Sequence, residues 1–158
     1  MFNPDTAPAT LYVPSFETAA RSLKVVPIIA PVHSDAEIET AVTTLGREPG
    51  GGLAVFGTFA VTHRAPIISA AARNNVAAVY GLSESARDGG LQSYGVDRVD
   101  IYRRAAFYVD RILRGEKPGD LPVQLPTKFE MVMNRRTATA LGLAIPPSIL
   151  LRADEVIE

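Results

Sequence analysis

Apolar and polar positions follow one another in blocks that predict strands and helices in turn. Four short apolar runs predict strands, at residues 24–30, 53–56, 76–80 and 91–94. Between the runs, apolar residues recur at helical spacing over 34–45 and 62–74. Strands that alternate with helices at this spacing imply parallel crossovers, so we expect an α/β fold, a three-layer sandwich with a mostly parallel sheet.

A capping motif and two prolines predict where some of these elements begin or break. Ser34 and Glu37 stand at the spacing of a capping box, which predicts that a helix begins after Ser34. Pro14 should break the first helix or delay its start, because a proline inside a helix lacks the amide donor. For the same reason Pro27 makes the run at 24–30 an edge strand or gives it a bulge.

The clearest helical pattern lies between Asp97, a suitable cap, and Gly115, a suitable stop. Its apolar stripe contains Tyr102, Ala105, Ala106, Val109, Ile112 and Leu113. A proline-rich connector at 117–126 follows, and residues 128–133 alternate as a strand does. We expect a short helix at 135–141 and a last turn that ends at residues 152–154.

Composition narrows the class of protein. The 158 residues suit one domain, and a net charge of -1 offers no electrostatic footprint for nucleic acid. With no cysteine and only His33 and His63, the chain has little material for a metal site, and we predict neither metal nor cofactor. No apolar stretch is long enough for a membrane span. The first residues lack an export signal, so we expect a cytoplasmic location if the chain is expressed as given.

Candidate ligand contacts follow the predicted strands. In open parallel sheets, ligands sit beyond the carboxyl ends of the strands. The polar and aromatic residues there are Asn3, Thr6, Thr58, Phe59, Tyr80, Ser83, Ser93 and Tyr94. They suit a small polar ligand, with hydroxyl and amide groups as hydrogen-bond partners and aromatic rings as stacking surfaces. The alternative is that strand ends simply need turn residues, and for any single position we favour that alternative.

No catalytic residue is predicted. His63 stands near the start of a helix, where a solvated or capping role is more common than catalysis. Adjacent residues such as His33, Ser34 and Asp35 cannot form a nucleophile–base–orienter arrangement by themselves. The sequence contains no other activated nucleophile or metal spacing, so we do not expect an enzyme.

The order of motifs resembles the substrate-binding proteins of ABC transporters, of the type that includes tryptophan and tyrosine binders. The carboxyl-terminal motifs are a Gly-Gly turn and Tyr-Gly break at 89–95, the helix at 102–115, and segments 121–123, 126–130, 134–148 and 152–158. Upstream motifs lie at 2–8, 30–33, 47–52 and 63–64. The resemblance therefore covers nearly the whole chain.

The resemblance implies the second lobe of a type I periplasmic binding protein, with flavodoxin-like topology and the lobe's first strand missing. Residues 1–95 would form the second-lobe domain. Residues 96–126 would be the helix and connector that pack on the first lobe in relatives, and 127–158 the returning strand and short helices. The helix at 97–115 then lacks its apolar partner here, so we expect self-association as a homodimer or higher oligomer, by exchange of elements or by a continued sheet.

The resemblance also implies a function: binding of a small organic molecule such as an amino acid, an ABC permease as partner, and a periplasmic location. Residues 82–85 lack the arginine that many relatives carry there, so a carboxylate ligand is less expected. A single lobe should bind ligand weakly, because half of the contacts and the closure are absent. The alternative is a self-associating structural module or truncated product without ligand binding.

Overall fold

The computed structural model describes residues 1–5, 7–57 and 59–158. Its centre is a five-stranded sheet in the order β1-β2-β3-β4-β5. The strands are β1 (Gly52–Val55), β2 (Ala77–Tyr80), β3 (Gln92–Val96), β4 (Phe129–Asn134) and β5 (Glu155–Ile157). Only the β3–β4 pair is antiparallel, and the other three pairs are parallel. The predicted α/β class with a mostly parallel sheet is confirmed.

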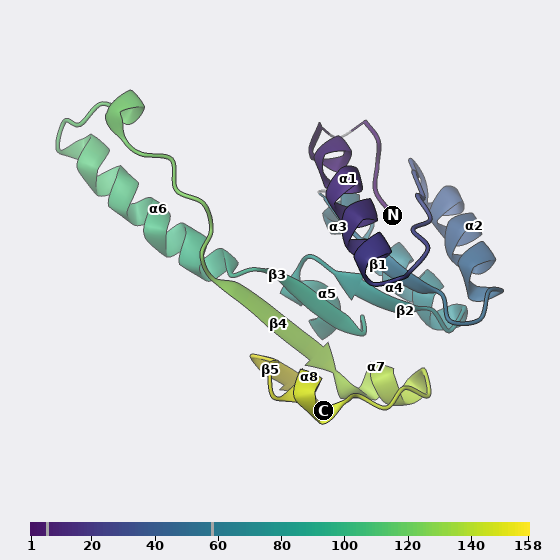
Figure 1. Cartoon of the computed structure of the whole chain (residues 1–158). Coiled ribbons are helices and arrows are strands. Elements are labelled where there is room, and N and C mark those ends of the chain that lie inside the picture. Colours follow the sequence, from purple (N-terminus) through teal and green to yellow (C-terminus); the bar gives the residue numbers. More distant parts are fainter. Residues whose placement is uncertain (6, 58) are drawn as a thin grey trace.

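Helices flank this sheet (Figure 1). They are α1 (Ala7–Ser22), α2 (Asp35–Gly46), α3 (Phe59–Thr62), α4 (Arg64–Arg73), α5 (Ser83–Arg87), α6 (Arg98–Leu113), α7 (Arg135–Ala140) and α8 (Pro147–Leu150), with a 3₁₀ turn η1 (Pro118–Asp120). Helix α2 packs against α4, and α5 contacts both β3 and β4. On the opposite face of β1, the rings of Tyr12 and Phe16 in α1 contact Phe56.

The main core lies between α2, α4 and one face of the first two strands. Ile38 and Val42 of α2 and Ile67 of α4 are fully buried there, against Val55 of β1. Burying each such aliphatic side chain contributes about 1.5–3 kcal/mol. This packing fixes the β1–β2 register, and with it the position of the loops that leave both strands.

The predicted helix signals are largely confirmed. Ser34 caps α2 by accepting a hydrogen bond from the Glu37 amide, and the Glu37 carboxylate accepts from the amide of His33 rather than from that of Ser34. Asp97 caps α6 in the same way through the Asp100 amide. Gly115 follows α6 with a φ of 98°, a backbone conformation that favours glycine.

Three predicted boundaries are wrong. Helix α1 runs unbroken through Pro14, held on both sides of the proline by the Tyr12 and Phe16 contacts with Phe56. The predicted helix at 62–74 is α4, but it begins at Arg64, because Thr62 ends a separate short helix, α3, that the sequence did not predict. Residues 155–157, placed beyond the last turn, form β5, a strand too short for its pattern to be recognised.

The predicted strand at 24–30 is also absent. Only one bridge forms in this region, between Phe2 and Pro31, and Val26 is 81% exposed. Two prolines, Pro27 and Pro31, cannot donate to a ladder, and Lys24 has a φ of 57°. Among the described residues, this extended apolar segment pairs only through Phe2.

Helix α6 and the connector after it stand away from the rest of the molecule (Figure 1). None of the α6 residues is buried. The helix contacts the connector instead, where Arg104 donates to Gln124 and Thr127 and the Tyr108 hydroxyl donates to the Pro122 carbonyl. We call α6 and residues 114–127 the arm. Its apolar side chains remain exposed, as predicted for a stripe without its partner.

Substitution of Gly95 tests how closely the loops approach at the end of β3. A Cβ at Gly95 would lie 2.0 Å from the Gly81 carbonyl oxygen, so backbone must shift in Gly95→Ala. We expect a loss of about 3 kcal/mol in the free energy of unfolding, the upper end for overpacking. Urea denaturation measures it, with Gly119→Ala as control because nothing lies within 4 Å of that Cβ position. Equal stability of the two variants would contradict the close approach.

Candidate ligand site at the strand ends

The carboxyl ends of the first three strands meet at one edge of the sheet. Val55 pairs with Tyr80, and Tyr80 with Ser93. Met1 lies beside Val55, because its nitrogen donates to the Ala54 carbonyl and its carbonyl accepts from the Phe56 amide. The loops that begin at residues 3, 57 and 81 therefore leave the sheet on the same side, as the sequence predicted. The predicted loop at 93–95 is wrong, because β3 continues past Ser93 to Val96 in pairing with β4.

The first loop is joined to the start of α2 by polar contacts. The Asp5 amide donates to Asn3 Oδ1 at 2.8 Å. His33 Nε2 lies 3.6 Å from Asp5 Oδ2, and His33 Nδ1 lies 3.2 Å from Glu37 Oε2. Because Glu37 accepts the His33 backbone amide and lies beside its ring, the pKa of the Glu37 carboxyl is lowered. Asn3 is thus held on a loop with carboxylates around it.

The second loop leads into a stack of two rings. Phe59 is buried, and its ring lies 4.1 Å from the His63 ring between centroids. His63 Nδ1 lies 2.6 Å from Asp35 Oδ1, which links the start of α4 to the start of α2. In this conformation Phe59 supports the loop from beneath and presents little ring surface to solvent.

Tyr94 presents the largest exposed ring among the predicted contacts. It is 54% exposed and stacks on Phe129 of β4 at 5.8 Å between centroids. Beside it, Arg98 at the start of α6 donates to Glu84 of α5 at 3.1 Å. The end of β3 therefore presents an exposed aromatic ring, and the Arg98–Glu84 ion pair joins the arm to α5 of the domain.

Three other predicted contacts are buried. The Tyr80 side chain is 2% exposed, and burial raises the pKa of its hydroxyl. Ser93 is fully buried, and within the described residues neither hydroxyl has a hydrogen-bond partner. Ser83 is also buried and accepts from Arg87 at 3.1 Å. These side chains lie under the loops, whereas Asn3 and Tyr94 lie at their surface.

Thr6 and Thr58 fall outside the described residues. Sequence reasoning gave no ligand role to His33, Asp35, Glu37 and His63, which surround the first two loops. In the sequence, each of these residues follows an extended segment or stands near the start of a helix, and that position is the signal that could have identified it. Within the residues that the structure covers, no cluster of three metal-ligating side chains forms and no helix is long and apolar enough to cross a membrane.

Solved structures share this arrangement of sheet, helices and arm. A conserved domain protein from Vibrio cholerae superposes with a TM-score of 0.86 at 23% identity, over 98% of this chain and 52% of that chain. An ABC domain in complex with L-Trp from Streptococcus pneumonia gives 0.86 at 22% identity, over 99% and 54%. CD0873, a substrate-binding protein with adhesive properties from Clostridium difficile, gives 0.70 at 16%, over 99% and 52%. These likenesses show that the chain has the fold of part of each of these proteins.

The family follows from the sequence match. Residues 1–157 match the family described as ABC transporter substrate binding protein, so the chain belongs to that family. No curated protein sequence matches. The chain spans about half the length of the solved structures it matches.

Glu37→Gln tests the contact between the first loop and α2. Because the folded pKa of Glu37 is lowered, its ionised form adds stability above the ordinary pKa, and that contribution is lost as pH falls through the folded value. We expect Glu37→Gln to have a lower free energy of unfolding than wild type at pH 7, and the difference to shrink as pH falls below the ordinary titration range of glutamate. Glu48→Gln is the exposed control. A Glu37→Gln deficit that persists in acid would contradict this account.

Proposed function

We propose that the chain supplies one wall of a solute-binding cleft for an ABC import system, in the periplasm and with a permease as partner. Membership of the substrate-binding family supports this proposal. The observation that carries it is the meeting of three loops with the outer part of β3 at one edge of the sheet, where open α/β sheets bind ligands. The cleft would be completed by a second lobe, on which residues 96–126 would pack beside the domain of residues 1–95 and 127–158.

Within this wall we assign contacts by exposure. Asn3 and Tyr94 would touch the ligand directly. Thr6 and Thr58 stay candidates on the sequence alone, because they fall outside the described residues. Phe59, Tyr80, Ser83 and Ser93 would set the loop positions from beneath, because the structure buries them.

The proposed ligand is a small organic molecule such as an amino acid. A similar fold, in the protein from Streptococcus pneumonia, was solved with L-Trp. Asp5, Asp35 and Glu37 around the first two loops would favour an ammonium group there by Coulomb attraction. The carboxylate of an amino acid would need donors from outside this wall, because residues 82–85 contain no arginine.

A nuclear magnetic resonance titration with L-tryptophan and L-tyrosine tests this function. We expect amide shifts confined to residues 3–5, 57–59, 81–83 and 94–95, with a dissociation constant near about 1 mM because one wall gives few contacts. Tyr94→Ala should weaken binding by about 0.5–1.5 kcal/mol through the lost ring contact.

Tyr102→Ala is the matched control, since Tyr102 is an exposed tyrosine on the arm. Shifts spread over other surfaces, or equal losses from the two tyrosine variants, would contradict the proposed cleft. Micromolar affinity of this chain for either amino acid would show that one wall binds it tightly by itself. That result would contradict the proposal that a second lobe completes the cleft.

A second candidate function is self-association without ligand, and the arm favours it. Seven apolar side chains of α6 are exposed: Val99, Ile101, Tyr102, Phe107, Val109, Ile112 and Leu113. Covering each of them fully would contribute about 1.5–3 kcal/mol. Two copies could cover one another's arms through a two-fold contact.

Light scattering coupled to size exclusion tests this candidate. If the arm is the contact, wild-type protein at about 10 µM should elute as a dimer or larger species, and Leu113→Lys should elute as a monomer, because a buried unpaired charge is costly. Leu151→Lys, which changes an equally exposed leucine away from the arm, should elute as wild type. A monomeric wild type would eliminate self-association.

A further inference from the structure

The outer part of β3, which leads the chain into the arm, lies directly against one loop of the candidate ligand site. A Cβ at Gly95 would lie 2.0 Å from the Gly81 carbonyl oxygen and 2.9 Å from the Gly81 carbonyl carbon, so the two backbones are in contact. Gly95 also pairs with Glu130 of β4, the strand by which the chain returns from the arm. The Gly81 peptide is therefore packed beside the place where the arm joins the sheet.

A second contact joins the same two segments further along the chain. Arg98, in the first turn of α6, donates from Nη1 to Glu84 Oε1 at 3.1 Å, and Glu84 lies in the first turn of α5. Residues 81–84 and 95–98 are therefore joined by backbone packing at one end and by an ion pair at the other. We call residues 81–84 the arm-side loop.

Helix α5, which follows the arm-side loop, is fixed to the domain. Its residues Ser85 and Ala86 are fully buried. Arg87 donates to Ser83 Oγ at 3.1 Å, and its Nη2 lies 2.7 Å from Glu155 Oε2 of β5. The loop itself begins with Gly81, a residue type whose backbone adopts many conformations at little cost. A displacement of the arm is therefore taken up in the loop rather than in the body of α5.

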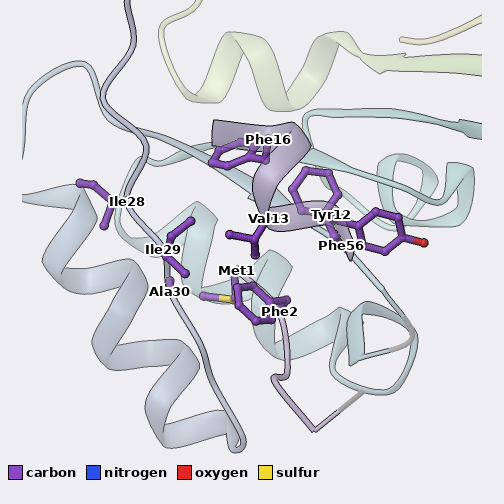
Figure 2. Close-up of a pocket in the computed structure, with 9 residues that line it drawn as sticks. All are labelled: Met1, Phe2, Tyr12, Val13, Phe16, Ile28, Ile29, Ala30 and Phe56. Carbon is purple, nitrogen blue, oxygen red and sulfur yellow. The ribbon is translucent and has the colours of Figure 1, made fainter. Parts of the chain in front are cut away.

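The first two loops of the candidate site are attached to other elements. Phe2, which directly precedes the first loop, lines an apolar pocket together with residues of α1 (Figure 2). Asp5 Oδ2 in that loop lies 3.6 Å from His33 Nε2, just before α2. His63, after the second loop, contacts Asp35 at the start of α2. The candidate site thus has one part held by α1 and α2 and another part held by the base of the arm.

We propose that Glu84 and Arg98 are positioning residues for the candidate ligand site: the orientation of the arm sets the conformation of the arm-side loop relative to the first two loops. Coupling between two sites is reciprocal, so a ligand that contacts this loop also biases the arm. An exposed ion pair changes an equilibrium by up to about fivefold, so the coupling is a modest bias. Its role in ligand binding rests on the proposed function, whereas the link between loop and arm does not.

Nuclear magnetic resonance relaxation dispersion of the full chain tests the link without any ligand, because it detects motion on the microsecond to millisecond timescale. In Arg98→Gln the ion pair is lost, so we expect dispersion to increase together at the amides of residues 81–83 and of α6, and to fit one exchange rate. The amides of Asn3, Asp5 and Gly57 should keep their wild-type values. Glu84→Gln should have the same effect, and the double variant no larger one, because all three remove the same contact.

Two further variants serve as controls. Arg98→Lys keeps a positive charge within reach of Glu84 and should restore the wild-type dispersion. Arg114→Gln removes an ion pair with Asp110 near the far end of α6 and should leave the arm-side loop unchanged. Dispersion confined to α6 in Arg98→Gln would overturn the proposal, and so would an equal effect of Arg114→Gln on the loop.

A titration with L-tryptophan separates this inference from the proposed function. On binding, amide shifts in wild type should extend from residues 81–83 into α6, and in Arg98→Gln the dissociation constant should change by up to about fivefold. Binding with an unchanged constant in both Arg98→Gln and Glu84→Gln would overturn the positioning role. Absence of binding to wild type would contradict the proposed function, and the dispersion experiment would still decide whether the loop and the arm move together.

Discussion

The antiparallel pairing of β3 with β4 holds the two ends of this chain in one sheet. Between the two strands the chain leaves the domain through the arm, and α6 contributes no buried residue that could bring it back. Five residue pairs, from Gln92–Met133 to Val96–Phe129, restore the connection. The Lys128 ammonium lies 2.7 Å from Asp97 at the base of the arm and lowers the pKa of that carboxyl. Contacts from α5 and the turn after it reinforce the ladder: Arg87 pairs with Glu155 of β5, and the Thr137 hydroxyl of α7 donates to the Gly89 carbonyl.

Much of the fold could be predicted because its signals are local. The Ser34 and Asp97 caps depend on side chains and amides three residues apart, which the sequence displays directly. The apolar run at 24–30 shows the opposite situation. Its composition is that of a strand, but a strand exists only when a neighbour pairs with it, and the described chain provides that neighbour for one bridge alone. Helix α1 likewise tolerates Pro14 because distant Phe56 contacts compensate.

The candidate site also has one part that the sequence predicts and another part that depends on distant residues. The rule for parallel sheets correctly placed three loops at one edge, since strand order and direction follow from the alternating pattern. The end of β3 was placed too early, because residues 94–96 pair with β4, which lies far away in the sequence. Which side chains lie at the surface could not be read in the same way. Tyr80 and Ser93 are buried by the packing of residues from other elements, such as Gly90 against the Tyr80 ring. The histidine and carboxylate contacts around Asn3 depend on α2 meeting the first loop, which is a tertiary event.

The base of the arm has a mechanical consequence. Two chain segments, at Asp97 and at Lys128, cross between domain and arm side by side, joined by a backbone hydrogen bond and an ion pair. A double tether of this kind resists sideways swinging, because one segment would have to stretch while the other buckled. The two segments can twist about their common long axis more easily than they can bend in that direction. The Arg98–Glu84 hydrogen bond, which joins the first turn of α6 to α5, would oppose such a rotation of the arm.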